Sequence, residues 1–253
     1  MMANAAPWAL VLLAAFAAGV LNAIAGGGSF LTFPALVFTG LPPIMANATS
    51  AVAVSPGYLG STLGFRAELA VLPRTRLVRE GMVCATGGVC GALLLLVTPA
   101  KVFSAAVPWL LLFATVLFAA GPRLVAARAR RGAGHVHPMA QALGLFAVAV
   151  YGGYFNGGLG ILLMALYTLT GESRVNTANA LKNLNSLVLS LLSVAAFAWA
   201  GAIHWPQALV MMVAATAGGF AGARLALRLP AATVRAAVVV TGLVMAVVFF
   251  VRR

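Results

Sequence analysis

Charged side chains are scarce in this sequence: they make up 8% of its 253 residues, and the first of them is Arg66. A soluble protein of this size needs a polar surface, and so few charged side chains cannot form one. Crossing the hydrocarbon core takes about 20 apolar residues per helix, so residues 1–65 have room for two or three passages. Further apolar runs occupy residues 82–98, 104–122, 139–155, 157–170, 178–200, 207–223 and 233–251.

The runs also lack the strict alternation of apolar and polar residues that marks the strands of a membrane barrel. They are instead long and rich in Ala and Leu, with hydrophobic residues forming 63% of the chain. We therefore expect an all-α polytopic membrane protein that is embedded in the lipid bilayer.

Acidic residues are the rarest charged group, because Glu68, Glu80 and Glu172 are the only carboxylate side chains in the sequence. Each falls in or beside a stretch that we expect to be a loop. A protein that exchanges cations normally needs a carboxylate at membrane depth, and none is visible in the apolar runs. This shortage argues against a cation as the transported species.

Cysteine and histidine are also sparse. Cys84 and Cys90 lie six residues apart inside an apolar run, where we expect small core residues and neither a disulfide nor a metal pair. His135, His137 and His204 fall in loops and show no metal-ligand spacing. No nucleophile–base set is recognisable either. We therefore predict no enzyme activity, no metal site and no cofactor.

The formal charge of +13 could suggest a nucleic-acid partner. The arginines, however, cluster in short loops between apolar runs, where they set membrane topology and contact lipid headgroups. We expect no nucleic-acid partner. The two largest loop clusters are Arg66, Arg74, Arg76 and Arg79, and then Arg123, Arg128, Arg130 and Arg131.

An internal repeat with an offset of 131 residues runs through the chain. Gly26 matches Gly157, and the ungapped register extends to the pairs Pro7 and Pro138, Thr39-Gly40 and Thr170-Gly171, Gly87-Gly88 and Gly218-Gly219, and Ala105-Ala106-Val107 and Ala236-Ala237-Val238. We infer two homologous halves, residues 1–131 and 132–253, within one membrane domain. In membrane chains, paired glycine-broken segments of this kind point to a transport site where the halves meet.

Charge counting indicates how the halves are related. If the segments broken near Gly27 and Gly158 each cross the membrane once, ten basic residues lie on one side and five on the other. If each forms a hairpin, the division becomes twelve against three, with the intramembrane Lys182 left out of both counts. The larger bias fits the rule that basic loops stay in the cytoplasm. The hairpin gives each half an odd number of crossings, so we expect inverted halves with both termini outside the cytoplasm.

The two glycine breaks are the first candidate substrate site. Consecutive glycines weaken a helix by about 1 kcal/mol each, and the helix that starts after a break points free N–H groups and a partial positive charge back at it. An anion would suit that position. The candidate residues of the first break are Asn22, Gly26, Gly27, Gly28 and Ser29, and those of the second are Asn156, Gly157, Gly158 and Gly160. Close packing of helices through small residues is the alternative, and we prefer it for Gly87, Gly88, Gly91, Gly218, Gly219 and Gly222.

Polar residues at the start of the next helix in each half form the second candidate group: Asn47, Thr49 and Ser50, then Asn179, Lys182 and Asn183. Capping of the helix end is the alternative for such residues, and it is the better one for Asn176 or Thr177. Capping does not explain Lys182, which lies well inside an apolar run. It can either reach the membrane interface or compensate the charge of an anionic substrate.

These motifs resemble the sulfite exporter TauE/SafE family of bacterial transporters. The resemblance rests on the stretch from Asn22 to Pro34, then Gly40-Leu-Pro-Pro43 and Ala46-Asn-Ala-Thr-Ser50, and on Gly157-Gly158-Leu159-Gly160 with Gly171. It covers nearly the whole chain and implies about eight transmembrane segments. It also implies transport of small sulfur-containing anions such as sulfite, sulfonates or sulfoacetate. In the second half Leu159 stands in place of a glycine, which leaves the substrate open.

We therefore expect a membrane transporter of a small anion, with its substrate near mid-membrane between the two breaks. An anion channel and a non-transporting membrane scaffold or subunit are the alternatives. The sequence leaves open the direction of transport, the coupling ion and whether the protein forms a homodimer.

Overall fold

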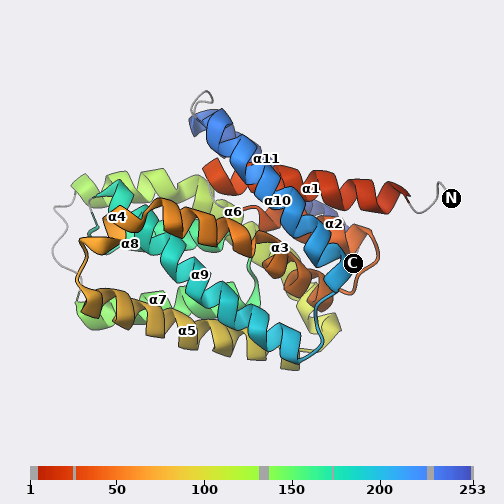
Figure 1. The fold of residues 1–253 in the computed structure, drawn as a ribbon, viewed down its shortest axis with the longest axis horizontal. Coiled ribbons are helices and arrows are strands. Elements are labelled where there is room, and N and C mark those ends of the chain that lie inside the picture. The colour runs from red at the N-terminus through yellow and green to blue at the C-terminus, as the bar shows by residue number, and fades with distance from the viewer. Residues whose placement is uncertain (1–4, 25–26, 131–136, 173, 227–230, 252–253) are drawn as a thin grey trace.

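The computed structural model describes residues 5–24, 27–130, 137–172, 174–226 and 231–251. These residues form helices and connecting loops, without a strand among them (Figure 1). The helices are α1 (Ala5–Ile24), α2 (Ser29–Phe38), α3 (Pro43–Gly64), α4 (Arg66–Ala70), α5 (Arg74–Val97), α6 (Ala100–Arg130), α7 (Pro138–Tyr154), α8 (Leu159–Leu169), α9 (Val175–Trp199), α10 (Trp205–Ala226) and α11 (Ala231–Val251). The predicted all-α class is confirmed.

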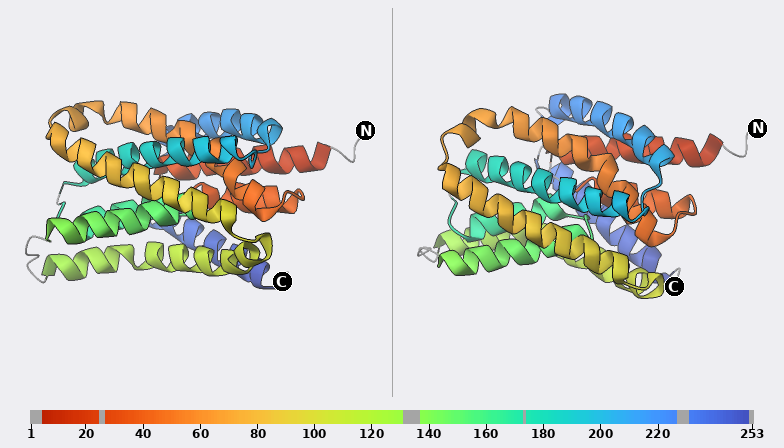
Figure 2. Two further views of the ribbon diagram at one scale, coloured as in Figure 1. Left: turned by 90° about the horizontal axis from the view of Figure 1, so that it is seen from below. Right: turned by 60° about the horizontal axis from the view of Figure 1, so that its bottom comes forward.

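The two broken segments are hairpins. In Figures 1 and 2, α1 runs inward from the right-hand end of the molecule and α2 returns toward the same end. Helices α7 and α8 do the same from the left-hand end. Of the two arrangements considered for the breaks, the structure has the one in which each segment turns back. The two hairpins therefore enter from opposite ends of the helix bundle.

Helix order recurs along the chain. Helices α1, α2, α3, α5 and α6 begin at residues 5, 29, 43, 74 and 100, and α7 to α11 begin at 138, 159, 175, 205 and 231. The pairing of helices recurs too: α1 packs on α10 as α7 packs on α5, and α3 packs on α10 as α9 packs on α5. Two further pairs, α3 with α9 and α6 with α11, join equivalent helices. This exchange supports the expected duplication, whose common origin and inversion stay predictions.

Glycines allow the closest of these helix contacts. A Cβ added at Gly91 of α5 would overlap the carbonyl oxygen of Val150 in α7, and one at Gly218 of α10 would overlap that of Phe16 in α1. One at Gly87 would lie 3.0 Å from the carbonyl oxygen of Phe146. Helix backbones can approach each other this closely only where small residues such as glycine leave room. The packing interpretation is confirmed for these three glycines, while the surroundings of Gly222 lie outside the described residues.

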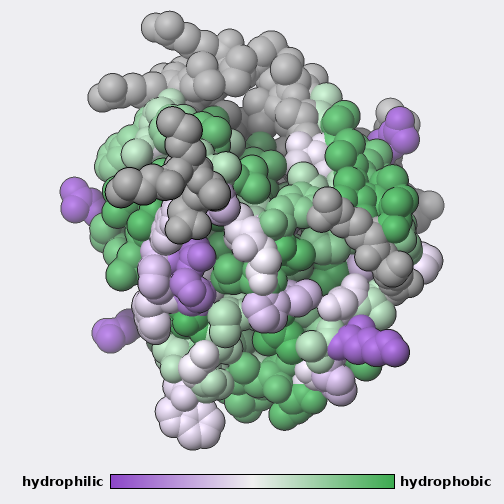
Figure 3. Space-filling model, turned by 90° about the vertical axis from the view of Figure 1, so that its right-hand side faces the viewer, coloured by the Kyte–Doolittle hydropathy of each residue, from purple (hydrophilic) through white to green (hydrophobic). Residues whose placement is uncertain are grey.

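Apolar side chains cover much of the outer surface. Trp199 and Phe220 keep 88% and 75% of their surface exposed, and green apolar side chains dominate the flanks of the end-on view in Figure 3. Within the described residues, three helical stretches are long and apolar enough to cross a bilayer, namely Arg74–Val97, Ala100–Gly121 and Val175–Trp199. Shorter apolar helices include Ser29–Phe38 and Leu159–Leu169, the second arms of the hairpins.

Candidate functional site

The first break lies between α1 and α2, and the side chain of Asn22 closes it. Asn22 Oδ1 accepts hydrogen bonds of 2.9 Å from the backbone N–H groups of both Gly27 and Gly28. Gly27 has φ 140°, a backbone conformation that favours glycine. We expected these N–H groups to bind an anion directly, but the structure occupies them with the amide oxygen. Gly26 lies outside the described residues, and Ser29 is buried at the start of α2.

The second break, between α7 and α8, has a different closure. Gly158 has φ 80° and precedes the first residue of α8. The hydroxyl of Tyr151 donates to the carbonyl oxygen of Gly157 at 2.9 Å. Asn156 is 4% exposed, and its Nδ2 is buried without a hydrogen-bond partner in the described part of the chain. Its Oδ1 accepts from the hydroxyl of Tyr58 at 3.5 Å. This break therefore keeps one polar group unsatisfied.

The two breaks lie next to each other, as expected. A Cβ built at Gly27 would lie 3.4 Å from Cδ1 of Ile161, and a Cβ built at Gly158 would lie 3.4 Å from Cζ of Phe30. Each break thus touches the first turn of the other hairpin's second arm. The contact is apolar, because it is made by the hydrophobic side chains of Phe30 and Ile161, both of which are buried. The described residues that make this contact offer apolar side chains and no hydrogen-bond donor to an anion.

A cavity of about 390 Å³ lies beside this contact, bounded by α1, α3, α9, α10 and the first turn of α8. Its polar lining consists of Asn22, Tyr58, Ser61, Lys182, Asn183 and Thr216. Glycines and apolar residues complete the wall, among them Val54, Pro56, Gly160 and Phe220. The cavity brings together residues from both predicted breaks and from the second polar group.

Among the described residues that line the cavity, Lys182 is the only charged one. It lies seven residues after the start of α9, or about 10 Å along the helix axis. All three glutamates of the chain pair with other cations, Glu80 and Glu172 with Arg76 and Glu68 with Arg174. Lys182 has no carboxylate partner among the described residues. Its charge is therefore uncompensated in a largely apolar cavity.

Several predicted site residues hold helices together instead of lining the cavity. Asn47 Nδ2 donates to the carbonyl oxygen of Tyr154 at 3.2 Å. The hydroxyls of Ser50 and Thr32 share a hydrogen bond of 2.6 Å. Thr49 Oγ1 accepts from the backbone N–H of His204 at 3.0 Å. These side chains satisfy polar groups between helices, which explains their polarity without a ligand.

Among the other predicted residues, Asn179 is half-buried but does not line the cavity, and Gly157 packs on the ring of Phe155. The sequence interpretation missed Tyr58 and Ser61, which lie three residues apart on one face of α3 just after Pro56. This spacing of two polar residues on one helix face could have identified them as candidate site residues.

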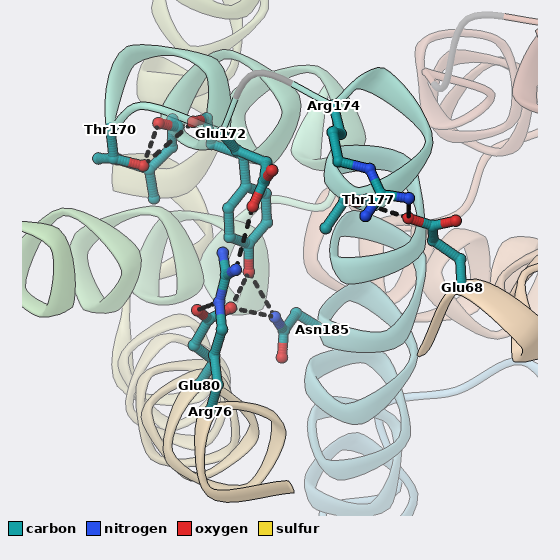
Figure 4. Close-up of polar contacts among 10 residues, drawn as sticks. Glu68, Arg76, Glu80, Thr170, Glu172, Arg174, Thr177 and Asn185 are labelled. Carbon is teal, nitrogen blue, oxygen red and sulfur yellow. Dashed lines mark hydrogen bonds and ion pairs between the residues drawn. The ribbon is translucent and has the colours of Figure 1, made fainter. Parts of the chain in front are cut away.

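The expectation that every glutamate lies in or beside a loop is wrong for Glu80. It is 2% exposed and lies in the second turn of α5. Arg76 Nε donates to Glu80 Oε1 at 2.9 Å, the Tyr167 hydroxyl donates to Oε2 at 2.7 Å, and Asn185 Nδ2 donates to Oε2 at 3.4 Å. Figure 4 shows Arg76 and Glu80 of α5 close to Asn185 of α9, and the hydroxyl of Tyr167 joins them from α8. Tyr167 and Asn185, which cover the carboxylate, lie 87 and 105 residues away in the sequence, so no local pattern reveals the burial of Glu80.

The chain matches the family model described as sulfite exporter TauE/SafE over residues 11–249. The chain belongs to this family. It is similar to a probable membrane transporter protein of Haemophilus influenzae, with 30% identity over 244 residues that cover 94% of this chain and 92% of that protein. It is 28% identical to the probable membrane transporter protein ORF9 of a Sinorhizobium species, covering 94% and 90% of the two chains. No solved structure matches.

A third relative is the probable membrane transporter protein YfcA of Escherichia coli K12, with 29% identity over 93% of this chain and 87% of that protein. The family membership, the bacterial relatives of nearly equal length and the apolar helices all indicate the same kind of protein. The chain is a multi-pass inner-membrane transport protein.

Proposed function

We propose that the chain carries a small anion across the membrane and binds it in the cavity beside Lys182. The single observation that carries this proposal is the position of Lys182, which lines the cavity and has no carboxylate partner in the part of the chain that the structure describes. An unpaired cation in an apolar setting is unfavourable, and an anion placed about 4 Å from it gains about 4 kcal/mol at the effective dielectric constant of protein sites. The same cation would repel a positively charged substrate.

Hydrogen-bond donors near Lys182 add to this preference. Asn183 follows it on α9, and Ser61 faces the cavity from α3. The first turn of α8 reaches the cavity at Gly160, so the partial positive charge of that helix start acts in the same direction. All of these groups suit the oxygens of an oxyanion.

Asn22 links the first break to the cavity. Its Oδ1 is held by the N–H groups of Gly27 and Gly28, so the remaining amide group, Nδ2, is the part that can serve a ligand. A Cβ built at Gly57, another lining residue, would lie 3.9 Å from this Nδ2. The break thus acts on the anion indirectly, because its N–H groups orient a side-chain donor toward the cavity.

The family suggests the class of substrate. Because its name refers to sulfite export, we propose a small sulfur oxyanion or an organosulfonate, of the sulfite, sulfonate or sulfoacetate class. The cavity volume of about 390 Å³ falls within the range of about 300–1,000 Å³ seen for small-molecule sites. It accommodates any member of this class.

Binding to the purified protein tests the proposal. Sulfite, methanesulfonate, sulfoacetate, sulfate and chloride are compared by thermal stabilisation and calorimetry, on the wild type and on Lys182→Met and Lys182→Arg. We expect at least one of the three sulfur anions of the proposed class to bind the wild type and chloride not to. Lys182→Met should lose binding, while Lys182→Arg keeps part of it because the charge remains. Equal binding by the Met variant would remove Lys182 from the site.

A further inference from the structure

Helix α9 carries a line of buried polar side chains that continues beyond the anion cavity. Asn183, Ser186, Ser190 and Ser193 are each 6% exposed or less. They follow one another at intervals of three, four and three residues, so they lie on one face of the helix. Asn183 lines the cavity, and Ser193 lies about 15 Å further along the helix axis. The three serines are called the serine face of α9 below.

Ser186 is the member of this face that helix packing does not explain. Its side chain is fully buried, and its hydroxyl has no hydrogen-bond partner in the described part of the chain. Other hydroxyls in these helices donate to the carbonyl four residues earlier, as Ser55 does to Ala51 and Thr216 does to Met212. Ser186 does not make this bond. A buried hydroxyl without a partner is unfavourable, so Ser186 holds a donor available for a ligand.

The free hydroxyl lies next to the cation of the cavity. Ser186 follows Lys182 by four residues and Asn183 by three, so it is a neighbour of both on α9. An anion that moves from Lys182 along this face therefore meets the Ser186 hydroxyl first. The serine face contains no carboxylate that would repel it.

A contact between α3 and α9 closes the serine face in this structure. The hydroxyls of Ser190 and Ser55 share a hydrogen bond of 2.7 Å. The two helices pack side by side (Figures 1 and 2). Ser55 stands between Val54 and Pro56, which both line the cavity, so the contact lies at the cavity wall. Both partners are neutral hydroxyls, and each can exchange the other for an anion.

Pro56 makes α3 easier to bend beside this contact. Proline has no N–H group, so the carbonyl of Val52 lacks its usual partner within the helix. Helices bend preferentially at such positions. A bend of α3 at Pro56 would separate Ser55 from Ser190 and join the serine face to the cavity.

Beyond Ser190, the serine face leads toward the far end of α9. The hydroxyl of Ser193 donates to the carbonyl oxygen of Gly88 in α5 at 3.2 Å. Helix α9 ends at Trp199, near the right-hand end of the molecule in Figure 1, and the side chain of this residue is exposed. The buried hydroxyls thus run from the cavity toward the end of the bundle opposite to the start of α9.

We propose that the anion leaves the cavity along the serine face of α9, and that the contact between Ser55 and Ser190 is the gate of this route. The inference rests on the proposed function, because it needs an anion at Lys182. A hydroxyl donates one hydrogen bond and carries no charge, so it holds an anion less firmly than Lys182 does. Passage needs contacts that are favourable enough to enter and weak enough to leave. The cavity therefore binds the anion, and the serine face lets it pass.

The test compares affinity with flux. Radiolabelled sulfite, methanesulfonate and sulfoacetate are measured for binding to the purified protein and for flux in liposomes. Ser186→Ala removes the free donor, so flux should fall about tenfold, as loss of one hydrogen bond to a charged group implies, while affinity changes by less than about twofold. Ser190→Leu fills the route, so flux should fall to background leak at unchanged affinity.

Thr115→Val and Ala195→Leu are the matched controls. Thr115 is a buried residue of α6 whose hydroxyl donates to the carbonyl of Leu111, so its replacement removes a hydroxyl outside the route. Ala195 is exposed, nine residues after Ser186 and so on the opposite face of α9. Leu at this position adds bulk outside the route. Both control variants should transport at the wild-type rate.

Wild-type flux in Ser186→Ala or in a folded Ser190→Leu variant overturns the route. A parallel loss of affinity and flux overturns it as well, because it places the serines in the binding site. If Ser190→Leu does not fold, the smaller change at Ser186 decides. Each of these outcomes leaves the proposed function intact. A wild type that binds none of the three anions, or binds them without transporting them, overturns the proposed function itself.

Discussion

Asn22 has two separable tasks in this account, and substitution can divide them. Its Oδ1 accepts from the N–H groups of Gly27 and Gly28, and its Nδ2 is the group offered to the anion. Asn22→Ala removes both. Each buried N–H left without a partner costs about 1–3 kcal/mol, whereas hydrogen bonds between membrane helices average about 0.6 kcal/mol. Asn22→Ala leaves two N–H groups without a partner, which would cost about 2–6 kcal/mol at the first value. Because hydrogen bonds in membrane proteins are weaker on average, we expect the free energy of unfolding to fall by about 2–4 kcal/mol.

Asn22→Asp is the informative partner variant. The carboxylate keeps an oxygen acceptor for the two N–H groups, so the break stays closed and stability stays near that of the wild type. The donor toward the cavity is lost and a negative charge replaces it, so anion binding should disappear. Unfolding in detergent measures stability, and calorimetry with the binding anion measures affinity. If Asn22→Ala unfolds like the wild type, or if Asn22→Asp still binds the anion, the relay through Asn22 is refuted.

Two further predictions use matched pairs. Gly91→Ala should lower the free energy of unfolding by about 1–3 kcal/mol, as overpacking does, because the added Cβ would overlap the carbonyl oxygen of Val150. Gly81→Ala on the same helix places its Cβ in open space, so it should be neutral or slightly stabilising. Measured free energies of unfolding compare the two variants. Asn183→Ala should weaken anion binding about tenfold, as loss of one hydrogen bond to a charged group implies, whereas Asn179→Ala, outside the cavity lining, should bind like the wild type in calorimetry.

The sequence was sufficient for the membrane class, the helix breaks and Lys182. Each of these depends on a local property: long apolar runs, consecutive glycines, and a cation within an apolar run. The structure adds left-handed backbone at Gly27 and Gly158 and places Lys182 in the cavity. These features could be recognised from neighbouring residues alone. A helix in lipid must form its backbone hydrogen bonds within itself, so glycines or a charged residue that interrupt an apolar run are easily recognised.

Partners across long sequence distances could not be read in the same way. Asn47 looked like a ligand residue because it is polar and near a helix start, but its amide serves the carbonyl of Tyr154, 107 residues away. Glu80 looked like a loop residue because it follows several arginines, but Tyr167 and Asn185 bury it. Polarity alone does not distinguish a group that awaits a ligand from one that another helix satisfies.

The measurement that tests the central claim most directly is anion flux into liposomes that contain the purified protein. Wild type, Lys182→Arg and Lys182→Met are compared with radiolabelled sulfite, after equal reconstitution and folding have been verified. We expect a saturable flux for the wild type, a reduced flux for the Arg variant and only background leak for the Met variant. A Met variant that transports sulfite as fast as the wild type would contradict the assignment of the cavity beside Lys182 as the anion site.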